Sequence, residues 1–193
     1  MSKSIYLVLD MQNDLIHVDG PSGKGPMVEQ VNQRNIIANT QRVIEKARKA
    51  GVPVGYVRVG FTAGYPECSS TSALFKGIKA NGLLQLDSWG GQVHDELKPH
   101  PGDLQIIKHR VSPFYSTTLQ VQLKAQGITH IYCSGVSTQA VVQATVRDAH
   151  DRDFEVTLIE DGCAAHTLEE HQNSVQSISR FCNVISAEAV AFA

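Results

Sequence analysis

The stretch Ile5-Tyr-Leu-Val-Leu-Asp10 contains five consecutive apolar residues and ends at a carboxylate. An amphipathic stretch over residues 31–50 follows, and Gly51 and Pro53 end it before a second apolar run over residues 53–59. A short apolar strand, a helix and another strand make one βαβ unit, which belongs to a parallel sheet. These residues therefore predict an α/β fold.

The same alternation of strands and helices continues to the end of the sequence. Strands are predicted at residues 5–10, 53–59, 104–108, 130–134, 155–159 and 183–185, and helices at residues 31–50, 117–126, 138–152 and 168–180. The strands are almost continuously apolar, as in a sheet that is covered on both faces. Right-handed crossovers then place helices on both sides of the sheet.

Length and composition exclude several classes of protein. The 193 residues favour a single domain over residues 1–193. A net charge of −2 without a basic block argues against nucleic-acid and membrane partners. The longest apolar runs fall far short of the ~18 residues that a membrane span needs. The apolar run near the N-terminus is too short for the ~7–15-residue core of a signal peptide, so we expect a cytoplasmic protein.

Four cysteines and eight histidines show no metal-binding spacing. Cys133 and Cys163 lie in or beside apolar strand-like runs, where cysteine usually packs as a small hydrophobic residue. We therefore expect no metal and no cofactor.

Residues 60–102 differ from the rest of the chain. They are rich in glycine and proline, and they also contain Phe61 and the only tryptophan, Trp89. Long connections in compact domains are usually functional or disordered, and the aromatic residues favour order. We expect this segment to wall a pocket with Phe61 and Trp89.

Three predicted strand ends carry groups suited to chemistry. In parallel sheets, ligands bind outside the carboxyl ends of the strands. Asp10 ends the first strand and suits proton transfer, although an isolated aspartate there more often caps a turn. Lys108 ends the third strand, where a lysine usually extends into solvent. If this strand neighbours that of Asp10, the two charges meet and each fixes the position and protonation state of the other. The turn at residues 135–138 leads into a helix whose first amide groups are suited to stabilise an oxyanion. The alternative is that Ser137 or Thr138 only caps this helix.

Together these segments resemble the isochorismatase-like hydrolase superfamily over nearly the whole chain. The matching motifs are Leu9-Asp10-Met11-Gln12-Asn13-Asp14, Lys108-His-Arg-Val-Ser-Pro-Phe114 with Thr118-Leu119, Gly135-Val-Ser-Thr138 through Thr145-Val-Arg-Asp-Ala149, and Glu160-Asp-Gly-Cys-Ala164. The resemblance implies a three-layer αβα sandwich around a mainly parallel sheet of about six strands. It also implies a site with an aspartate, a lysine and a cysteine, and a cis peptide between Ser137 and Thr138.

The resemblance fails at the nucleophile. The family's cysteine lies six residues after the glycine, and this position is Val141, which has no nucleophilic atom. Residues 57–61 also lack the Asp-x-His metal ligands of the nicotinamidases. Isochorismatases likewise lack the cysteine; they act on a vinyl ether, for which a carboxylic acid and water suffice.

The sequence leads us to expect a hydrolase of a small molecule, assembled as a homo-oligomer, in which Asp10 and Lys108 act with water and without a cysteine. The residues expected to contact the substrate are Gln12, Phe61, Trp89, Ser137, Thr138 and Val141. A catalytically inactive binding protein on the same scaffold is the alternative. An amidase that uses another cysteine is a third, minor hypothesis.

Overall fold

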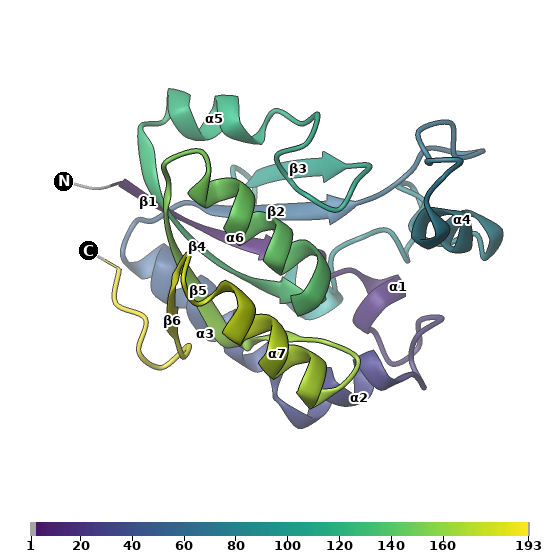
Figure 1. The fold of residues 1–193 in the computed structure, drawn as a ribbon, viewed down its shortest axis with the longest axis horizontal. Coiled ribbons are helices and arrows are strands. Elements are labelled where there is room, and N and C mark those ends of the chain that lie inside the picture. The colour runs from purple at the N-terminus through teal and green to yellow at the C-terminus, as the bar shows by residue number, and fades with distance from the viewer. Residues whose placement is uncertain (1–2, 193) are drawn as a thin grey trace.

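The strands form one parallel sheet in the computed structural model, which describes residues 3–192. Its order is β3-β2-β1-β4-β5-β6 (Figure 1). The strands are β1 Lys3–Leu9, β2 Val54–Val59, β3 Leu104–Lys108, β4 Ile128–Val136, β5 Glu155–Ala164 and β6 Asn183–Ile185. All five neighbouring pairs are parallel. The predicted α/β class and the six-stranded parallel sheet are confirmed.

Helices fill the connections between the strands. The α-helices are α1 Asn13–Ile16, α2 Pro26–Gln33, α3 Ile36–Lys49, α4 Ala73–Ala80, α5 Leu119–Ala125, α6 Gln143–His150 and α7 Leu168–Ile178. A 3₁₀ turn, η1, spans Asp95–Leu97, and a π-helical turn, η2, spans Thr138–Val142. Within residues 3–192, no helix has the length and apolar content that crossing a membrane requires.

The predicted helix over residues 31–50 is wrong in its first turn. Asn35 adopts a left-handed φ of 53°, which separates α2 from α3. Asparagine tolerates this conformation better than most residues, so the chain changes direction there. Helix α2 instead begins five residues before Val31, at Pro26, in the first helical position that proline favours.

Alternate residues of β1 pack on opposite faces of the sheet. Tyr6 and Val8 belong to the apolar cluster that includes the buried side of α3. Ile5 and Leu7 belong to the cluster that includes α5, α6 and the end of α7. Figure 1 shows these three helices on one face of the sheet and α3 on the other. The three-layer arrangement implied by the resemblance is therefore present, and burial on both faces explains the continuous apolar sequence of β1.

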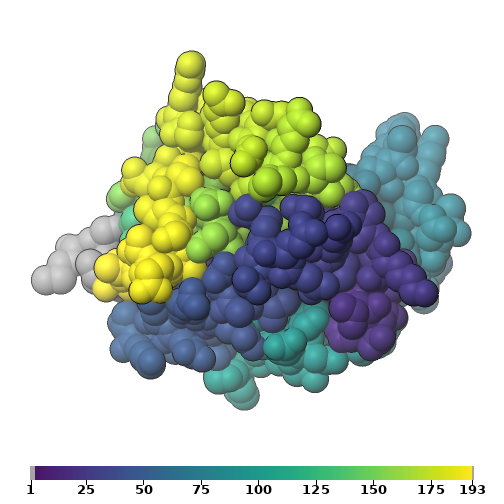
Figure 2. Space-filling model, turned by 90° about the horizontal axis from the view of Figure 1, so that it is seen from below, coloured from purple at the N-terminus to yellow at the C-terminus, as the bar shows by residue number. Residues whose placement is uncertain are grey.

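The long connection over residues 60–102 leaves the carboxyl end of β2 and returns to the amino end of β3, which pairs in parallel with β2. It contains α4, which stands at one end of the molecule in Figure 1 and projects from the body in Figure 2. Phe61, Tyr65, Phe75 and Leu84 form a separate small core beneath this helix. The segment is therefore ordered around its own apolar contacts, as its aromatic content predicts.

Gly135 allows β1 and β4 to approach closely at their carboxyl ends. Its φ is 148°, and a Cβ atom added there would lie 2.0 Å from the carbonyl oxygen of Leu9. Only glycine avoids this clash, because the atom in the way belongs to the backbone and cannot move aside as the end of a side chain could. This glycine therefore sets the spacing between Asp10 and the turn that follows β4.

Candidate functional site

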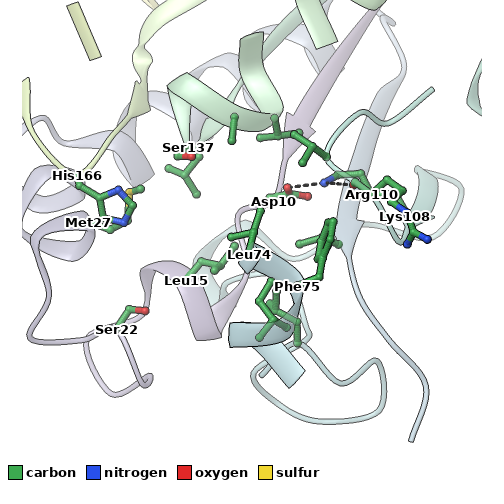
Figure 3. A pocket seen from close by; sticks show the side chains of 17 residues that line it. Asp10, Leu15, Ser22, Met27, Leu74, Phe75, Lys108, Arg110, Ser137 and His166 are labelled. Carbon is green, nitrogen blue, oxygen red and sulfur yellow. Dashed lines mark hydrogen bonds and ion pairs between the residues drawn. The ribbon is translucent and has the colours of Figure 1, made fainter. Parts of the chain in front are cut away.

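A cavity of about 220 Å³ lies at the carboxyl edge of the sheet. Asp10 follows β1, Lys108 ends β3 and Ser137 follows β4, and all three line the cavity (Figure 3). Ligands of open parallel sheets bind at this edge. The sheet thus brings together the three strand ends that the sequence identifies.

Asp10 and Lys108 form a buried ion pair. The Lys108 Nζ atom lies 2.8 Å from Oδ2 of Asp10, and only 2% and 6% of the two side chains are exposed. The predicted proximity is confirmed, but the strands are not neighbours, because β2 lies between β1 and β3. The long lysine side chain covers this distance across the end of β2.

The two carboxylate oxygens of Asp10 have different surroundings. Oδ2 is paired with Lys108, whereas Oδ1 is buried and has no hydrogen-bond partner within residues 3–192. Burial raises the pKa of Asp10 above its usual value, and the attraction of Lys108 and the nearby Val59 amide only partly opposes this effect. One carboxylate oxygen of Asp10 is therefore paired with Lys108 and the other has no partner. The pKa of the carboxyl group is raised.

Lys108 has a second bond that fixes its position. Its ammonium donates a hydrogen bond to the carbonyl oxygen of Arg110 at 3.1 Å. The guanidinium of Arg110 itself points away from Asp10 (Figure 3), donates to the carbonyl oxygens of Glu67 and His109, and lies over the ring of Phe75. Of these two cations, only Lys108 therefore pairs with Asp10.

The turn after β4 differs in one detail from the expectation. The cis peptide joins Val136 and Ser137, not Ser137 and Thr138. Strand β4 stays extended through Val136, so the chain changes direction one residue earlier than the motif suggests. Ser137 then precedes η2, and both Ser137 and Val141 line the cavity.

Cysteine side chains lie away from this cavity within the described part of the chain. Cys133 and Cys163 have no exposed surface and pack in the apolar core, whereas Val141 lines the cavity. Burial raises the pKa of Cys163 to about 12 and that of Cys133 well above its usual value. Both thiols are therefore protonated and inaccessible at neutral pH.

Iodoacetamide is expected to leave any hydrolytic activity of the native protein intact. The half-buried Cys68 and Cys182 are the accessible thiols, and neither lines the cavity. Mass spectrometry of the labelled protein, with activity measured on the same sample, tests this expectation. Inactivation that parallels labelling of Cys133 or Cys163 would instead support a thiol mechanism.

The segment over residues 60–102 walls the cavity with residues other than the predicted ones. Leu74, Phe75 and Ile78 of α4 line the cavity, together with Leu84. Phe61 is fully buried and supports Phe75 from behind.

Trp89 is also absent from the lining. Its side chain is 45% exposed and packs edge-on against the ring of His17. Its loop is held by Asn13, which donates a hydrogen bond to the Trp89 carbonyl oxygen. Helix α4 thus lines the cavity in place of Phe61 and Trp89. The sequence signal for this helix is Ser72, whose side chain caps its first turn.

Gln12 and Thr138, also predicted to contact the substrate, lie behind the cavity. The Gln12 amide donates hydrogen bonds to the carbonyl oxygens of Val59 and Gly91, and its oxygen accepts one from the Val59 amide. Thr138 is fully buried, with its hydroxyl 2.9 Å from Nδ1 of His171. Both residues position the walls of the site, because their polar atoms are used within the protein.

A polar network that the sequence analysis missed supports the turn after β4. Beyond Thr138, Nε2 of His171 lies 3.1 Å from Oε2 of Glu160 and 3.0 Å from a guanidinium nitrogen of Arg34. Arg34 and Glu160 form an ion pair at 2.9 Å. The network joins the end of α2 to β5, α7 and η2, and Figure 2 shows the dark-blue N-terminal region beside the yellow-green helix α7. Because these residues lie far apart in the sequence, no local pattern predicts that they meet.

Replacing His171 with asparagine is expected to weaken the fall in stability below pH 6.5. Burial and, secondarily, Arg34 lower the pKa of His171 from 6.5, so the unfolded chain binds a proton more readily than the folded one. Stability is therefore lost as the pH falls from 6.5. At pH 7 the free energy of unfolding of the variant should be about 1–2 kcal/mol lower, because the hydrogen bond to Thr138 is lost. Urea unfolding of both proteins at pH 7 and pH 5 measures the difference, and equal pH dependence would contradict it.

The donor groups offer no assembled metal site. Among residues 3–192, no group of three or more histidine, cysteine, aspartate or glutamate side chains is arranged to hold a metal ion. The ionisable pair at the cavity is the Asp10 carboxyl group with the Lys108 ammonium group.

Comparisons with known proteins identify the family of this chain. Residues 4–189 match the isochorismatase domain family. The chain is 31% identical over 187 residues to the uncharacterized isochorismatase family protein YecD of Escherichia coli O157:H7, covering 95% of this chain and 92% of that protein. It is also 31% identical to the ureidoacrylate amidohydrolase RutB of Variovorax paradoxus, over 86% of this chain and 70% of that one.

A solved structure extends the similarity. The N-carbamoylsarcosine amidase from Thermoplasma acidophilum superposes with a TM-score of 0.78 at 27% identity, covering 98% of this chain and 99% of that chain. The family match over residues 4–189 includes the three strand ends at the cavity. This chain therefore belongs to the isochorismatase family of hydrolases.

Proposed function

We propose that this protein hydrolyses a small organic molecule with water as the attacking group, using Asp10 as general acid or base and Lys108 as its electrostatic partner. The observation that carries the proposal is the free Oδ1 of Asp10, which is buried beside the cavity while Lys108 holds Oδ2. A catalytic acid or base needs an oxygen within reach of the transferred proton. Oδ1 meets this requirement without breaking the ion pair.

For an amide or a urea, Asp10 acts as a base. It takes a proton from water while the water oxygen forms a bond to the carbonyl carbon. The C–N bond then breaks as the same proton passes to the leaving nitrogen, which regenerates the carboxylate. The amidohydrolase and amidase relatives, whose names describe this bond cleavage, support this class of reaction.

For a vinyl ether, Asp10 acts as an acid. Its protonated carboxyl group transfers a proton to the alkene carbon, and water adds to the resulting cation. The adduct loses a proton and separates into a ketone and an alcohol. The burial that raises the pKa of Asp10 also favours the protonated form that this reaction needs.

A screen of vinyl ethers, amides and ureas of small organic compounds tests the proposal. Hydrolysis in H₂¹⁸O should place one labelled oxygen in the product during a single turnover. Mass spectrometry should detect no covalent intermediate on the protein. A trapped acyl-enzyme, or the absence of any turnover, would contradict the proposal.

Val141→Ala is expected to keep hydrolysis within about tenfold of the parent rate, a change of less than ~1.4 kcal/mol in the barrier. The substitution removes two methyl groups from the cavity wall and no atom that makes or breaks a bond. Steady-state kinetics should show a change in KM larger than any change in kcat. A loss of kcat beyond 100-fold would assign Val141 a larger role than that of a wall.

The alternative is a catalytically inactive protein that binds a small molecule. The presence of Val141, which cannot act as a nucleophile, at the turn beside Asp10 favours this alternative. Tight binding of a screened compound that is recovered unchanged would make it the better description.

Three properties of the whole molecule stay predictions from the sequence. They are the single-domain organisation, the cytoplasmic location and the homo-oligomeric state. Sedimentation equilibrium of the purified protein tests the last of them directly.

A further inference from the structure

Two histidine rings and the only tryptophan ring pack together outside the cavity. The ring centroids of His17 and His94 lie 4.9 Å apart, and the ring of Trp89 lies at the same distance from that of His17. His94 is buried, and 17% of the His17 side chain is exposed. Neither histidine lines the cavity, so the proposed reaction does not use this pair.

Each of the two rings accepts a hydrogen bond from a backbone amide at Nδ1. Nδ1 of His94 accepts from the Glu96 amide at 3.3 Å, a contact that caps η1. Nδ1 of His17 accepts from the Asp19 amide at 3.0 Å. The proton of each neutral ring is therefore on Nε2. A second proton would have to bind Nδ1, and it would break the hydrogen bond to the amide.

The surroundings of His94 oppose its protonation. Burial lowers the pKa of His94 from 6.5, and the nearby His17 lowers it further. Glu96 and Asp95 attract a proton on His94 but do not reverse this effect. The carboxylate of Asp95 is also paired with Lys98 at 2.8 Å. His94 is therefore neutral at pH 7 while it stays in this position.

The carboxylates near His17 do not compensate for a charge on both rings. Oδ2 of Asp19 lies 3.8 Å from Nδ1 of His17, but the side chain is 83% exposed, so water screens its attraction. Asp95 attracts His17 as well, and it is 46% exposed. Two imidazolium rings at 4.9 Å repel each other. Acid therefore favours a conformation in which the two rings separate.

The two histidines belong to two segments that are bonded to each other beside Asp10. Residues 89–97 are hydrogen-bonded through their backbone to residues 11–14, the segment that follows Asp10. His17 directly follows α1 in this segment, and the His94 amide donates one of the backbone bonds at 2.8 Å. Separation of the rings therefore loosens residues 89–97 from the segment that holds Asp10.

We propose that His17 and His94 make the attachment of residues 89–97 acid-sensitive: the neutral rings hold these residues in place, and protonation of the pair releases them. The inference does not depend on the proposed function. Its sign follows from His94, which binds a proton less readily in the attached form than after release. The released population therefore grows as the pH falls below 6.5, by up to about tenfold per pH unit.

Hydrogen exchange of the native protein, followed by mass spectrometry between pH 7.5 and pH 5.5, tests the inference. After correction for the intrinsic exchange rate at each pH, amide protection is inversely proportional to the released population. The protection of residues 89–97 should fall about fivefold between pH 6.5 and pH 5.5, the change expected for one histidine that is freed by the opening. Protection in the central strands β1 and β4 should stay constant.

His94→Asn is the decisive variant. Asparagine also accepts a hydrogen bond from a capped amide, but it does not titrate. The variant should therefore lose the fall in protection, whatever its protection at pH 7.5. His17→Asn should show a smaller fall than the native protein, because burial of His94 remains. His150→Asn is the matched control, since His150 is exposed on α6, and it should show the full fall.

The fluorescence of Trp89 gives a second measurement, because it is the only tryptophan in the chain. Acrylamide is uncharged, so the charge of the histidines does not affect its approach. The quenching constant from fluorescence lifetimes should be larger at pH 5.5 than at pH 7.5 in the native protein, and equal at both in His94→Asn. Circular dichroism at both pH values should show the same folded protein.

Three outcomes would overturn the inference. The first is constant protection of residues 89–97 in the native protein, and the second is an equal fall in His94→Asn. The third is a loss of protection in β1 and β4 to the same extent, which would assign the acid response to unfolding of the whole chain. Since these measurements need no substrate, failure of the hydrolase proposal leaves their meaning unchanged.

Discussion

Asp10→Asn is expected to abolish hydrolysis, with a loss in kcat of at least about 10²–10⁴-fold, the usual contribution of a catalytic acid or base. Asparagine keeps the shape of the side chain and a hydrogen bond to Lys108, but it cannot exchange a proton. The measurement is single-turnover hydrolysis of a substrate found in the screen. A variant that hydrolyses this substrate as fast as the parent would refute the role given to Asp10.

A stability measurement must accompany this test, because the asparagine leaves a buried ammonium group without a counter-ion. Removing one partner of a buried pair typically costs about 3–5 kcal/mol. Circular dichroism at the assay temperature shows whether the variant is folded. Asp87→Asn is the matched control, since Asp87 is exposed and lies outside the cavity lining, and it should retain both activity and stability.

Lys108→Met is expected to destabilise the protein by about 3–5 kcal/mol at pH 7 and to recover part of this loss in acid. Burial already raises the pKa of Asp10 above 3.8, and loss of the ammonium removes the attraction that opposes this rise. The folded variant therefore holds the Asp10 proton to a higher pH than the unfolded chain does. The contribution of Asp10 to the stability of the variant is therefore fully present below pH 3.8 and is lost as the pH rises through the folded-state pKa.

Urea unfolding of Lys108→Met and the parent at pH 7 and pH 5 measures this effect. The double variant Asp10→Asn/Lys108→Met is the control, because it has neither charge and should lose the added pH dependence. A single variant as stable as the parent at pH 7 would show that Asp10 is already neutral in the folded protein.

The strands could be predicted because burial on both faces leaves a direct record in the sequence. Ile5, Leu7 and Leu9 face one side of the sheet and Tyr6 and Val8 the other, so five apolar residues in succession are required. The positions of Asp10 and Lys108 followed from the strand ends alone. The identity of the strand between them did not, because strand order depends on contacts between distant segments.

The cavity wall could not be predicted in the same way. Residues 73–80 form α4 within a segment rich in glycine and proline, whose composition does not predict a helix. The large aromatic side chains of Phe61 and Trp89 were instead predicted to form the wall. Which apolar side chain faces a cavity depends on the direction of the loop. Here Asp14 sets that direction by accepting a hydrogen bond from the Leu84 amide at 2.7 Å. That contact joins residues 70 positions apart.

The central place of β1 in the sheet has a consequence for how the chain folds during synthesis. β1 is the first strand to be made, but its second neighbour, β4, begins only at Ile128. Until the ribosome has released that segment, β1 has an unpaired apolar edge, which is a template for aggregation. Parallel pairing over such a separation is also slow. A nascent chain that stops before β4 should therefore require a chaperone to stay in solution, whatever the stability of the finished protein.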